Sequence, residues 1–131
     1  MVKYIAHIES NGKGWFSVYT KNEFPFGVIG EGATIEDAKK DFIAVFKEMS
    51  QKHKTRTGED VNGDFSFVMD TSAILQESKK YISFSVLAKL TGISESQISQ
   101  YACGTRKPKQ QQRERIIEGI HAIGQKCLSL F

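Results

Sequence analysis

The residues best suited to chemistry in this chain are polar side chains between positions 94 and 109. Serine hydroxyls and glutamine amides can pair with the edges of DNA bases, and short side chains allow close approach. Lysine and arginine, which follow directly, bind backbone phosphates without regard to base sequence. The pattern therefore predicts binding of double-stranded DNA through Ser94, Ser96, Gln97, Ser99, Gln100, Thr105, Arg106, Lys107 and Lys109.

Two helices joined by a tight turn would position these side chains. Ala88 is small enough for a close helix crossing, Gly92 tolerates the positive φ of a turn, and Ile98 returns an apolar side chain to the first helix. Ser94 can cap the second helix, with Gln97 three residues later as a capping box requires. This is the spacing of a helix-turn-helix, whose second helix enters the major groove. The alternative is an ordinary helical hairpin packed on a neighbouring element.

The predicted second helix carries one unexpected residue and is followed by a basic loop. Glu95 repels phosphates unless its carboxylate accepts a hydrogen bond from a cytosine amine. Gly104 can end the helix and Pro108 stops it from resuming, which leaves a basic loop between them. A solvated surface patch is the usual explanation of such a cluster. Its position directly after the predicted recognition helix favours phosphate contact instead.

A last helix over 110–130 is expected to close a small helical bundle. Its apolar face would hold Ile116, Ile120, Ile123 and Cys127. Further apolar residues that could serve a dimer interface are Ile117, Leu128, Leu130 and Phe131.

Charge is distributed unevenly along the 131 residues, whose net charge is +3. Residues 1–70 hold 9 Lys and Arg against 11 Asp and Glu, whereas residues 71–131 hold 9 against 4. We therefore predict two domains, 1–70 and 71–131, of which the basic second domain meets nucleic acid.

The first domain is predicted to be a compact α+β layer. Alternation over 2–9, an Asn-Gly turn signal at 11–14 and aromatic and β-branched residues over 15–20 predict a hairpin. After a break at 21–25, short strands are expected at 27–32 and 65–69. The order is thus strand, strand, strand, helix, strand, followed by an all-α domain, which makes the fold class α+β.

The helix of this layer is expected to begin at Thr34 and to fade at 51–54 into a loop over 55–64. Its apolar face would consist of Ile35, Ala38, Phe42, Val45 and Met49. The opposite sheet face has no helix to cover it. It would meet solvent, the C-terminal domain, a second copy or a partner.

Neither a metal site nor a nucleophile is indicated. Cys103 and Cys127 lie in predicted helices without metal-ligand spacing, as expected for reduced thiols in a cytosolic protein. The histidines are scattered, at His7, His53 and His121.

Metal-assisted hydrolysis would need acidic side chains that converge. The acidic residues near predicted strand ends, Glu9, Glu31 and Asp70, are better explained by turn and edge solubility, so we predict a non-enzyme without cofactor or metal.

Targeting signals are not indicated either. Lys3, His7 and Glu9 interrupt any apolar run at the N-terminus, so no signal peptide is expected. The longest apolar run, 42–46, is too short to cross a membrane. We expect a cytoplasmic protein.

Both halves resemble known families. Residues 71–131 resemble the Xre-type helix-turn-helix of lambda-repressor-like regulators, on Leu87-Ala88, Thr91-Gly92-Ile93-Ser94, Ile98, Tyr101 and Gly104-x-Arg106-x-Pro108. Residues 1–70 resemble the HicB antitoxin domain, a partial ribonuclease-H-like fold, on the opening hairpin, the strand at 27–32 and the helix start Thr34-x-Glu36-x-Ala38. The first strand lacks the Asp that ribonuclease-H-like enzymes place there. The order of the two halves is similar to that of HicB-type antitoxins with a DNA-binding tail.

The resemblance implies an antitoxin of a type II toxin–antitoxin system. The N-terminal domain would bind and mask a HicA-type toxin, an RNA-cleaving protein of double-stranded-RNA-binding fold. The C-terminal domain, as a homodimer or higher homo-oligomer, would bind a double-stranded DNA operator and repress the operon. The alternative is a stand-alone helix-turn-helix transcriptional regulator without a toxin partner.

Overall fold

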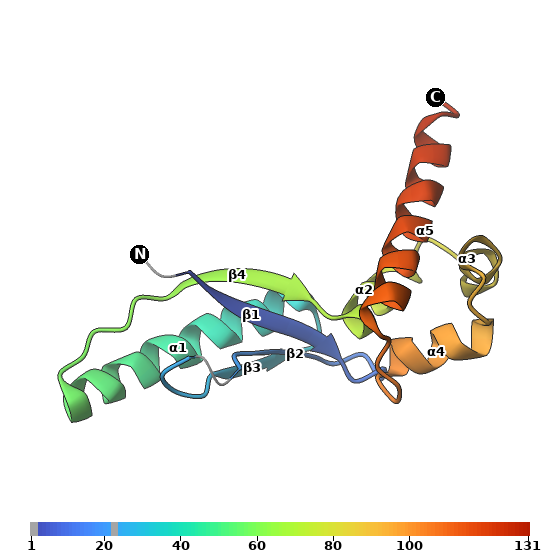
Figure 1. Cartoon of the computed structure of the whole chain (residues 1–131). Coiled ribbons are helices and arrows are strands. Elements are labelled where there is room, and N and C mark those ends of the chain that lie inside the picture. The colour runs from blue at the N-terminus through green and yellow to red at the C-terminus, as the bar shows by residue number, and fades with distance from the viewer. Residues whose placement is uncertain (1–2, 22–23) are drawn as a thin grey trace. The chain divides into compact units, whose positions relative to one another are not determined.

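The computed structural model describes residues 3–21 and 24–131, and the chain forms two compact units, Met1–Asp70 and Thr71–Phe131. Over the described residues it contains one four-stranded sheet and five helices (Figure 1), so the predicted α+β class is confirmed. Val2, in the first predicted strand, and residues 22–23, in the predicted break, lie outside the described residues.

The sheet of the N-terminal unit has the strand order β3-β2-β1-β4. Strand β1 (Lys3–Ser10) pairs antiparallel with β2 (Phe16–Tyr19), and β2 pairs antiparallel with β3 (Ile29–Gly32). Strand β4 (Asp64–Met69) pairs parallel with β1 on its other side. Alternation gives the sheet one buried face, where Ala6, Ile8, Phe16 and Val18 lie, and one outer face with exposed Ile5, Ile29 and Val68.

Helix α1 (Ile35–Thr57) covers the buried face of the sheet. Thr34 caps it as predicted, since its Oγ1 accepts a hydrogen bond from the N–H of Asp37 at 3.0 Å. The predicted end at 51–54 is wrong, and so is the first part of the predicted loop. The helix continues to Thr57 and is capped by Gly58, which takes a left-handed φ of 76° and donates its N–H to the carbonyl of Lys54.

Two glycines of β3 allow α1 to lie against the strand backbone. A Cβ at Gly30 would collide with the backbone nitrogen of Phe42, and one at Gly32 would lie 2.7 Å from that of Ala38. The glycines of this strand are therefore explained by close helix–strand approach.

Aromatic rings fill the space between α1 and the sheet. Phe42 lies edge-on to Phe65, with 4.9 Å between ring centroids. Phe24 packs edge-on against Tyr4 at 4.6 Å and is only 6% exposed. The sequence pattern treats 21–25 as a break between strands, whereas Phe24 in that segment is part of the core. Phe46, which lies outside the predicted apolar face of α1, also packs against Phe24.

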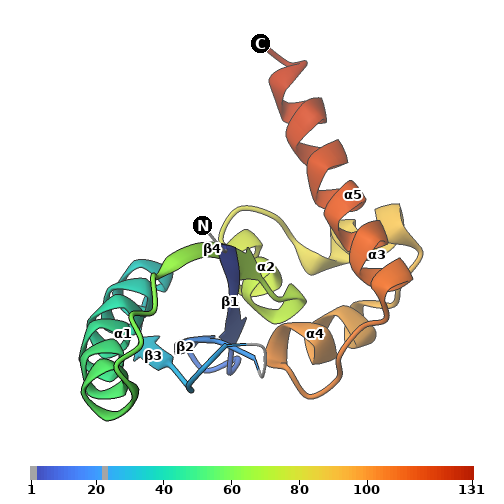
Figure 2. The ribbon, with the colours of Figure 1, turned by 60° about the vertical axis from the view of Figure 1, so that its left-hand side comes forward.

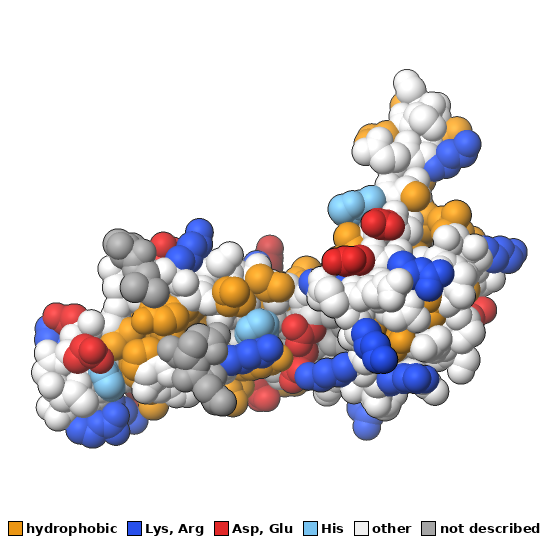
Figure 3. Space-filling view, viewed as in Figure 1, with side chains coloured by type: hydrophobic (Ala, Val, Ile, Leu, Met, Phe, Trp, Pro, Cys, Tyr) orange, Lys and Arg blue, Asp and Glu red, His pale blue; other side chains and the backbone are white. Residues whose placement is uncertain are grey.

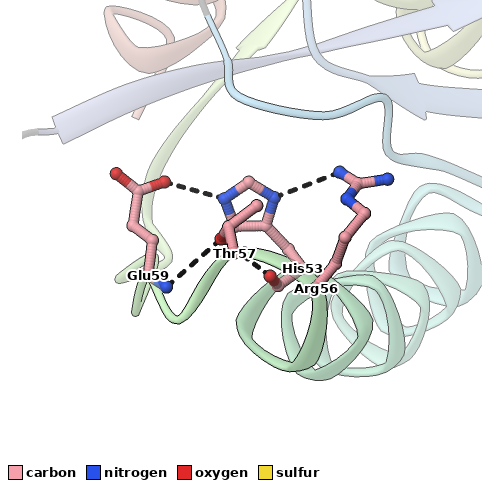
Figure 4. A network of polar contacts seen from close by, with 4 residues as sticks. All are labelled: His53, Arg56, Thr57 and Glu59. Carbon is pink, nitrogen blue, oxygen red and sulfur yellow. Dashed lines mark hydrogen bonds and ion pairs between the residues drawn. The ribbon is translucent and has the colours of Figure 1, made fainter.

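The C-terminal end of α1 is held by a polar network around His53 (Figure 4). The Nε2 atom of His53 lies 2.7 Å from Oε1 of Glu59, and Nδ1 lies 3.5 Å from Nη2 of Arg56. Thr57 donates to the carbonyl of His53 and accepts from the N–H of Glu59. The ring also packs on Phe26, with 5.2 Å between centroids. Both ring nitrogens are thus engaged within the chain, and the network fastens the segment after Gly58 to the helix.

On the outer face of the sheet, Tyr19 donates a hydrogen bond of 3.0 Å from its hydroxyl to Oδ2 of Asp70. His7 stacks on the Tyr19 ring, and its Nδ1 lies 3.9 Å from Oδ1 of Asp70. Burial raises the pKa of the Tyr19 phenol well above its ordinary value, and the nearby Asp70 carboxylate raises this pKa further.

Replacing Tyr19 with Phe should therefore change how stability depends on pH. At pH 8 the lost hydrogen bond should cost about 1 kcal/mol of unfolding free energy. Above about pH 10 the unfolded wild type loses the phenol proton that the folded state retains, so wild-type stability falls. The difference between the two proteins in urea unfolding should then shrink between pH 8 and 10.5. A difference that stays constant over this range would contradict the raised pKa.

The C-terminal unit consists of α2 (Thr71–Ser78), α3 (Phe84–Thr91), α4 (Glu95–Cys103) and α5 (Gln110–Leu128). Its core holds Leu75, Leu87, Ile93, Ile98, Tyr101, Ala102 and Ile116. Helix α2 also holds α4 through a buried hydrogen bond of 2.8 Å from the Gln76 amide to the carbonyl of Ala102. Helix α5 packs closely on α3 at Gly119, where a Cβ would lie 2.8 Å from Cγ2 of Thr91.

The second half of α5 extends beyond the other helices of its unit (Figures 1 and 2). Cys127 is exposed, so the predicted apolar face of α5 is not buried at this end of the helix. The helix ends at Leu128 rather than at 130, and Leu128, Leu130 and Phe131 are exposed. Among the helices of the described residues, none has the length and apolar character needed to span a membrane.

Candidate nucleic-acid interface

The turn between α3 and α4 is formed by hydrogen bonds between residues that are close in sequence. Gly92 ends α3 with a φ of 74° and donates its N–H to the carbonyl of Ala88. Ser94 begins α4, since its Oγ accepts from the N–H of Gln97 at 3.2 Å. The turn between the two helices thus spans positions 92–94, with Ile93 buried at its centre.

Helix α4 has one buried and one exposed side. Ile98, Tyr101 and Ala102 face the core and are at most 3% exposed. The opposite side presents Ser96, Ser99 and Gln100, which share one helix face by their spacing. Within the described part of the chain, the side chains of these three residues have no hydrogen-bond partner, so their donors and acceptors are available to a ligand.

Three other residues of the predicted site are engaged in local structure. Ser94 caps α4, and Thr105 donates from Oγ1 to the carbonyl of Gln100 at 3.2 Å. Gln97 is half-buried, and its amide donates to the hydroxyl of Tyr101 at 2.9 Å. Its side chain therefore does not reach back to the Ser94 N–H, and only one half of the predicted capping box is present.

The loop after α4 presents free cations. Gly104 ends the helix with a φ of 75°, and Arg106, Lys107 and Lys109 are exposed. None of these three side chains has a hydrogen bond or ion pair to residues 3–21 or 24–131. Figure 3 shows Lys and Arg side chains on the surface of the C-terminal unit. A polyanion could therefore approach these cations without displacing an internal carboxylate.

The start of α5 adds to this positive region. Its N-cap is Lys109, which makes no side-chain capping bond, and the first turn carries no acidic residue. The N-terminal N–H groups of a helix carry partial positive charge. Backbone and side chains therefore favour anions at the same place.

Glu95 occupies the first turn of α4 and is exposed. A carboxylate near a helix N-terminus interacts favourably with the helix dipole. Its position is thus explained by helix stability without any contact to a base.

Of the acidic residues near strand ends, Glu9 and Glu31 do not converge. Glu9 and Glu31 are both paired with Ser17, on opposite sides of it, which separates them by two strand spacings, or roughly 10 Å. The carboxylate of Asp70 is engaged by Tyr19. In residues 3–21 and 24–131 no group of three or more His, Cys, Asp or Glu residues is placed to hold a metal ion.

No protein-family model matches the chain, and comparison with curated proteins and with solved structures gave no match. In the C-terminal unit, the free polar side of α4 and the free cations directly after it are the features available to a ligand.

Proposed function

We propose that the C-terminal unit is an Xre-type helix-turn-helix that binds an operator in double-stranded DNA, with α4 as the recognition helix. One observation carries this proposal. Helix α4 is anchored by Ile98 and Tyr101. Its opposite side presents polar side chains and cations follow directly, and both sets of side chains have no partner among the described residues. Polar groups that read base edges beside cations that bind phosphate are the two components of sequence-specific DNA binding.

The roles differ along this surface. Arg106, Lys107 and Lys109 bind phosphates and set the register of the unit on the duplex. Ser96, Ser99 and Gln100 contact base edges in the major groove. Gln100 has a free carboxamide, which can pair with adenine through N6 and N7. As a homodimer or higher homo-oligomer, the protein would bind half-sites about one helical turn apart.

We further propose that the N-terminal unit is a HicB-like domain of partial ribonuclease-H-like fold that binds and masks a HicA-type toxin. The whole chain would then be an antitoxin that represses its own operon. The resemblance of residues 1–70 to the HicB domain supports this part, as do the exposed apolar side chains on the outer sheet face, Ile5, Ile29 and Val68. A stand-alone transcriptional regulator is the alternative.

The proposed recognition helix predicts different behaviour of Gln100→Ala and Gln97→Ala. Gln100→Ala should change the preference among operators by about 1–3 kcal/mol at one base pair, because it removes a base contact. Gln97→Ala should weaken binding to all sequences alike, because its amide holds Tyr101 rather than facing outward.

Both variants can be compared by titrating a selected duplex and its single-base variants at one salt concentration. A uniform loss for Gln100→Ala would mean that this residue only positions the helix. If Gln97→Ala changes the preference among operator sequences, Gln97 does contact a base.

Toxin masking is tested with the full-length protein. Added at an equimolar amount, it should suppress RNA cleavage by a HicA-type toxin, because the proposed complex covers the toxin. The variant with Arg106→Ala and Lys107→Ala should suppress cleavage equally well, since its changes lie in the other unit. Undiminished cleavage with the cognate toxin would favour the stand-alone regulator.

A further inference from the structure

We infer that Arg115, on α5, positions α4 for DNA binding by holding the turn between α3 and α4. The inference rests on the proposed function, which makes α4 the recognition helix. Arg115 stands outside the predicted DNA-binding residues, and its side chain is directed at the protein's own backbone.

The contacts of Arg115 are specific. Its Nη2 donates to the carbonyl oxygen of Thr91 at 2.5 Å, and its Nη1 donates to Oε1 of Gln112 at 3.2 Å. Thr91 is the last residue of α3, so this carbonyl is one that the helix itself leaves without an N–H partner. The guanidinium therefore supplies a charge-assisted bond at the negative end of the α3 dipole.

The turn is shaped around this contact. A Cβ at Gly92 would lie 3.0 Å from Nη2 of Arg115, so the glycine leaves room for the guanidinium in addition to taking a positive φ. The Thr91 hydroxyl donates to the carbonyl of Leu87 at 2.8 Å and accepts from the N–H of Ile93 at 3.2 Å. One turn further along α5, Gly119 brings the helix against the Thr91 methyl group.

These contacts give α4 two attachments. Its C-terminal end is held by the bond from Gln76 to the carbonyl of Ala102, and the turn before its N-terminal end is held by Arg115. Ser96 lies close to that N-terminal end, so a shift of the turn would displace it relative to the bases. By holding the carbonyl of Thr91, Arg115 thus fixes the position of the residues of α4 that contact bases.

The experiment uses the full-length protein with Arg115→Met, Arg115→Lys and, as a control on the other bond of this side chain, Gln112→Ala. Three quantities are measured: exchange rates of the amides of residues 92–96 without DNA, affinity for a selected duplex, and the slope of log affinity against log salt. Thermal unfolding checks that each variant is folded.

Arg115→Met should raise amide exchange in the turn and weaken specific binding roughly tenfold, about the worth of one charge-assisted hydrogen bond. The salt slope should stay at the wild-type value, because every phosphate contact is retained. Arg115→Lys should restore part of the affinity, and Gln112→Ala should have a smaller effect than Arg115→Met.

Two results would overturn the inference: unchanged exchange in the turn, or a slope flattened by about 0.9, as expected when one phosphate is no longer neutralised. If wild-type protein binds no duplex at all, the proposed function fails. The exchange measurement then still decides whether Arg115 holds the turn. Should Arg115→Met not fold, the same measurements on Arg115→Lys decide, because lysine keeps the charge but lacks the planar pair of donors.

Discussion

Replacing Arg106 and Lys107 together with alanine should weaken binding to every DNA sequence alike and reduce its salt dependence. Both side chains are exposed and have no partner in the described residues, so each is free to neutralise a phosphate. Each phosphate that is no longer neutralised should flatten the slope of log affinity against log salt by about 0.9. For the double variant, the fall in affinity between about 50 and 200 mM salt should therefore be roughly tenfold smaller than in wild type.

A matched control separates this effect from a general change of charge. Lys126 lies in the last turn of α5, outside the predicted site. Lys126→Ala removes one positive charge and should leave the salt slope at the wild-type value. If the double variant also keeps the wild-type slope, the basic loop does not contact phosphate.

Gly30→Ala should be the most destabilising small substitution in the N-terminal unit. The added methyl group would collide with the backbone of α1 at Phe42, and neither the strand nor the helix can yield by a side-chain rotation. Overpacking of this kind costs about 2–3 kcal/mol of unfolding free energy. The loss is measured by urea unfolding at neutral pH.

Gly27→Ala is the matched control for this prediction. A Cβ at Gly27 has nothing within 4 Å, and its φ lies outside the left-handed region, so alanine should be tolerated within about 0.5 kcal/mol. If both substitutions cost the same, the close approach of β3 and α1 is not what requires glycine at position 30.

Helix ends governed by local chemistry were predictable from the sequence. Thr34 and Ser94 cap their helices through hydrogen bonds to N–H groups three residues on, and Gly92 takes the positive φ expected of it. The partners in these bonds are close in sequence, so residue type alone is informative. The helical period likewise predicts the buried side of α4 at Ile98 and Tyr101.

Features that depend on distant partners were missed. Phe24 belongs to the core because it meets rings from β1, β4 and α1, and no alternation in its own segment indicates this. His53 becomes part of a network only because α1 continues past the predicted end to Thr57. From the sequence alone, Gly30 only weakens the strand prediction. The structure explains it by the helix backbone at Phe42, which leaves no room for a side chain.

In the candidate site, too, the features that depend on local spacing were predictable and those that depend on distant partners were not. Periodicity predicts that Ser96, Gln97, Ser99 and Gln100 all lie on the exposed side of α4, opposite its buried residues. This is right for Ser96, Ser99 and Gln100 and wrong for Gln97, which is half-buried. Periodicity does not predict that Gln97 is bonded to Tyr101. Nor does it predict that Arg115 reaches back to the carbonyl of Thr91, because that bond joins two helices that are distant in sequence.

The most direct test of sequence-specific DNA binding is a ratio of two affinities. A duplex is selected from a random pool with the full-length protein, and its dissociation constant is compared with that of a duplex of the same composition in shuffled order. At about 150 mM salt the selected duplex should bind at least about a thousandfold more tightly, since specific binders reach this ratio. Equal affinity for the two duplexes would show that α4 reads no bases, and would contradict its assignment as a recognition helix.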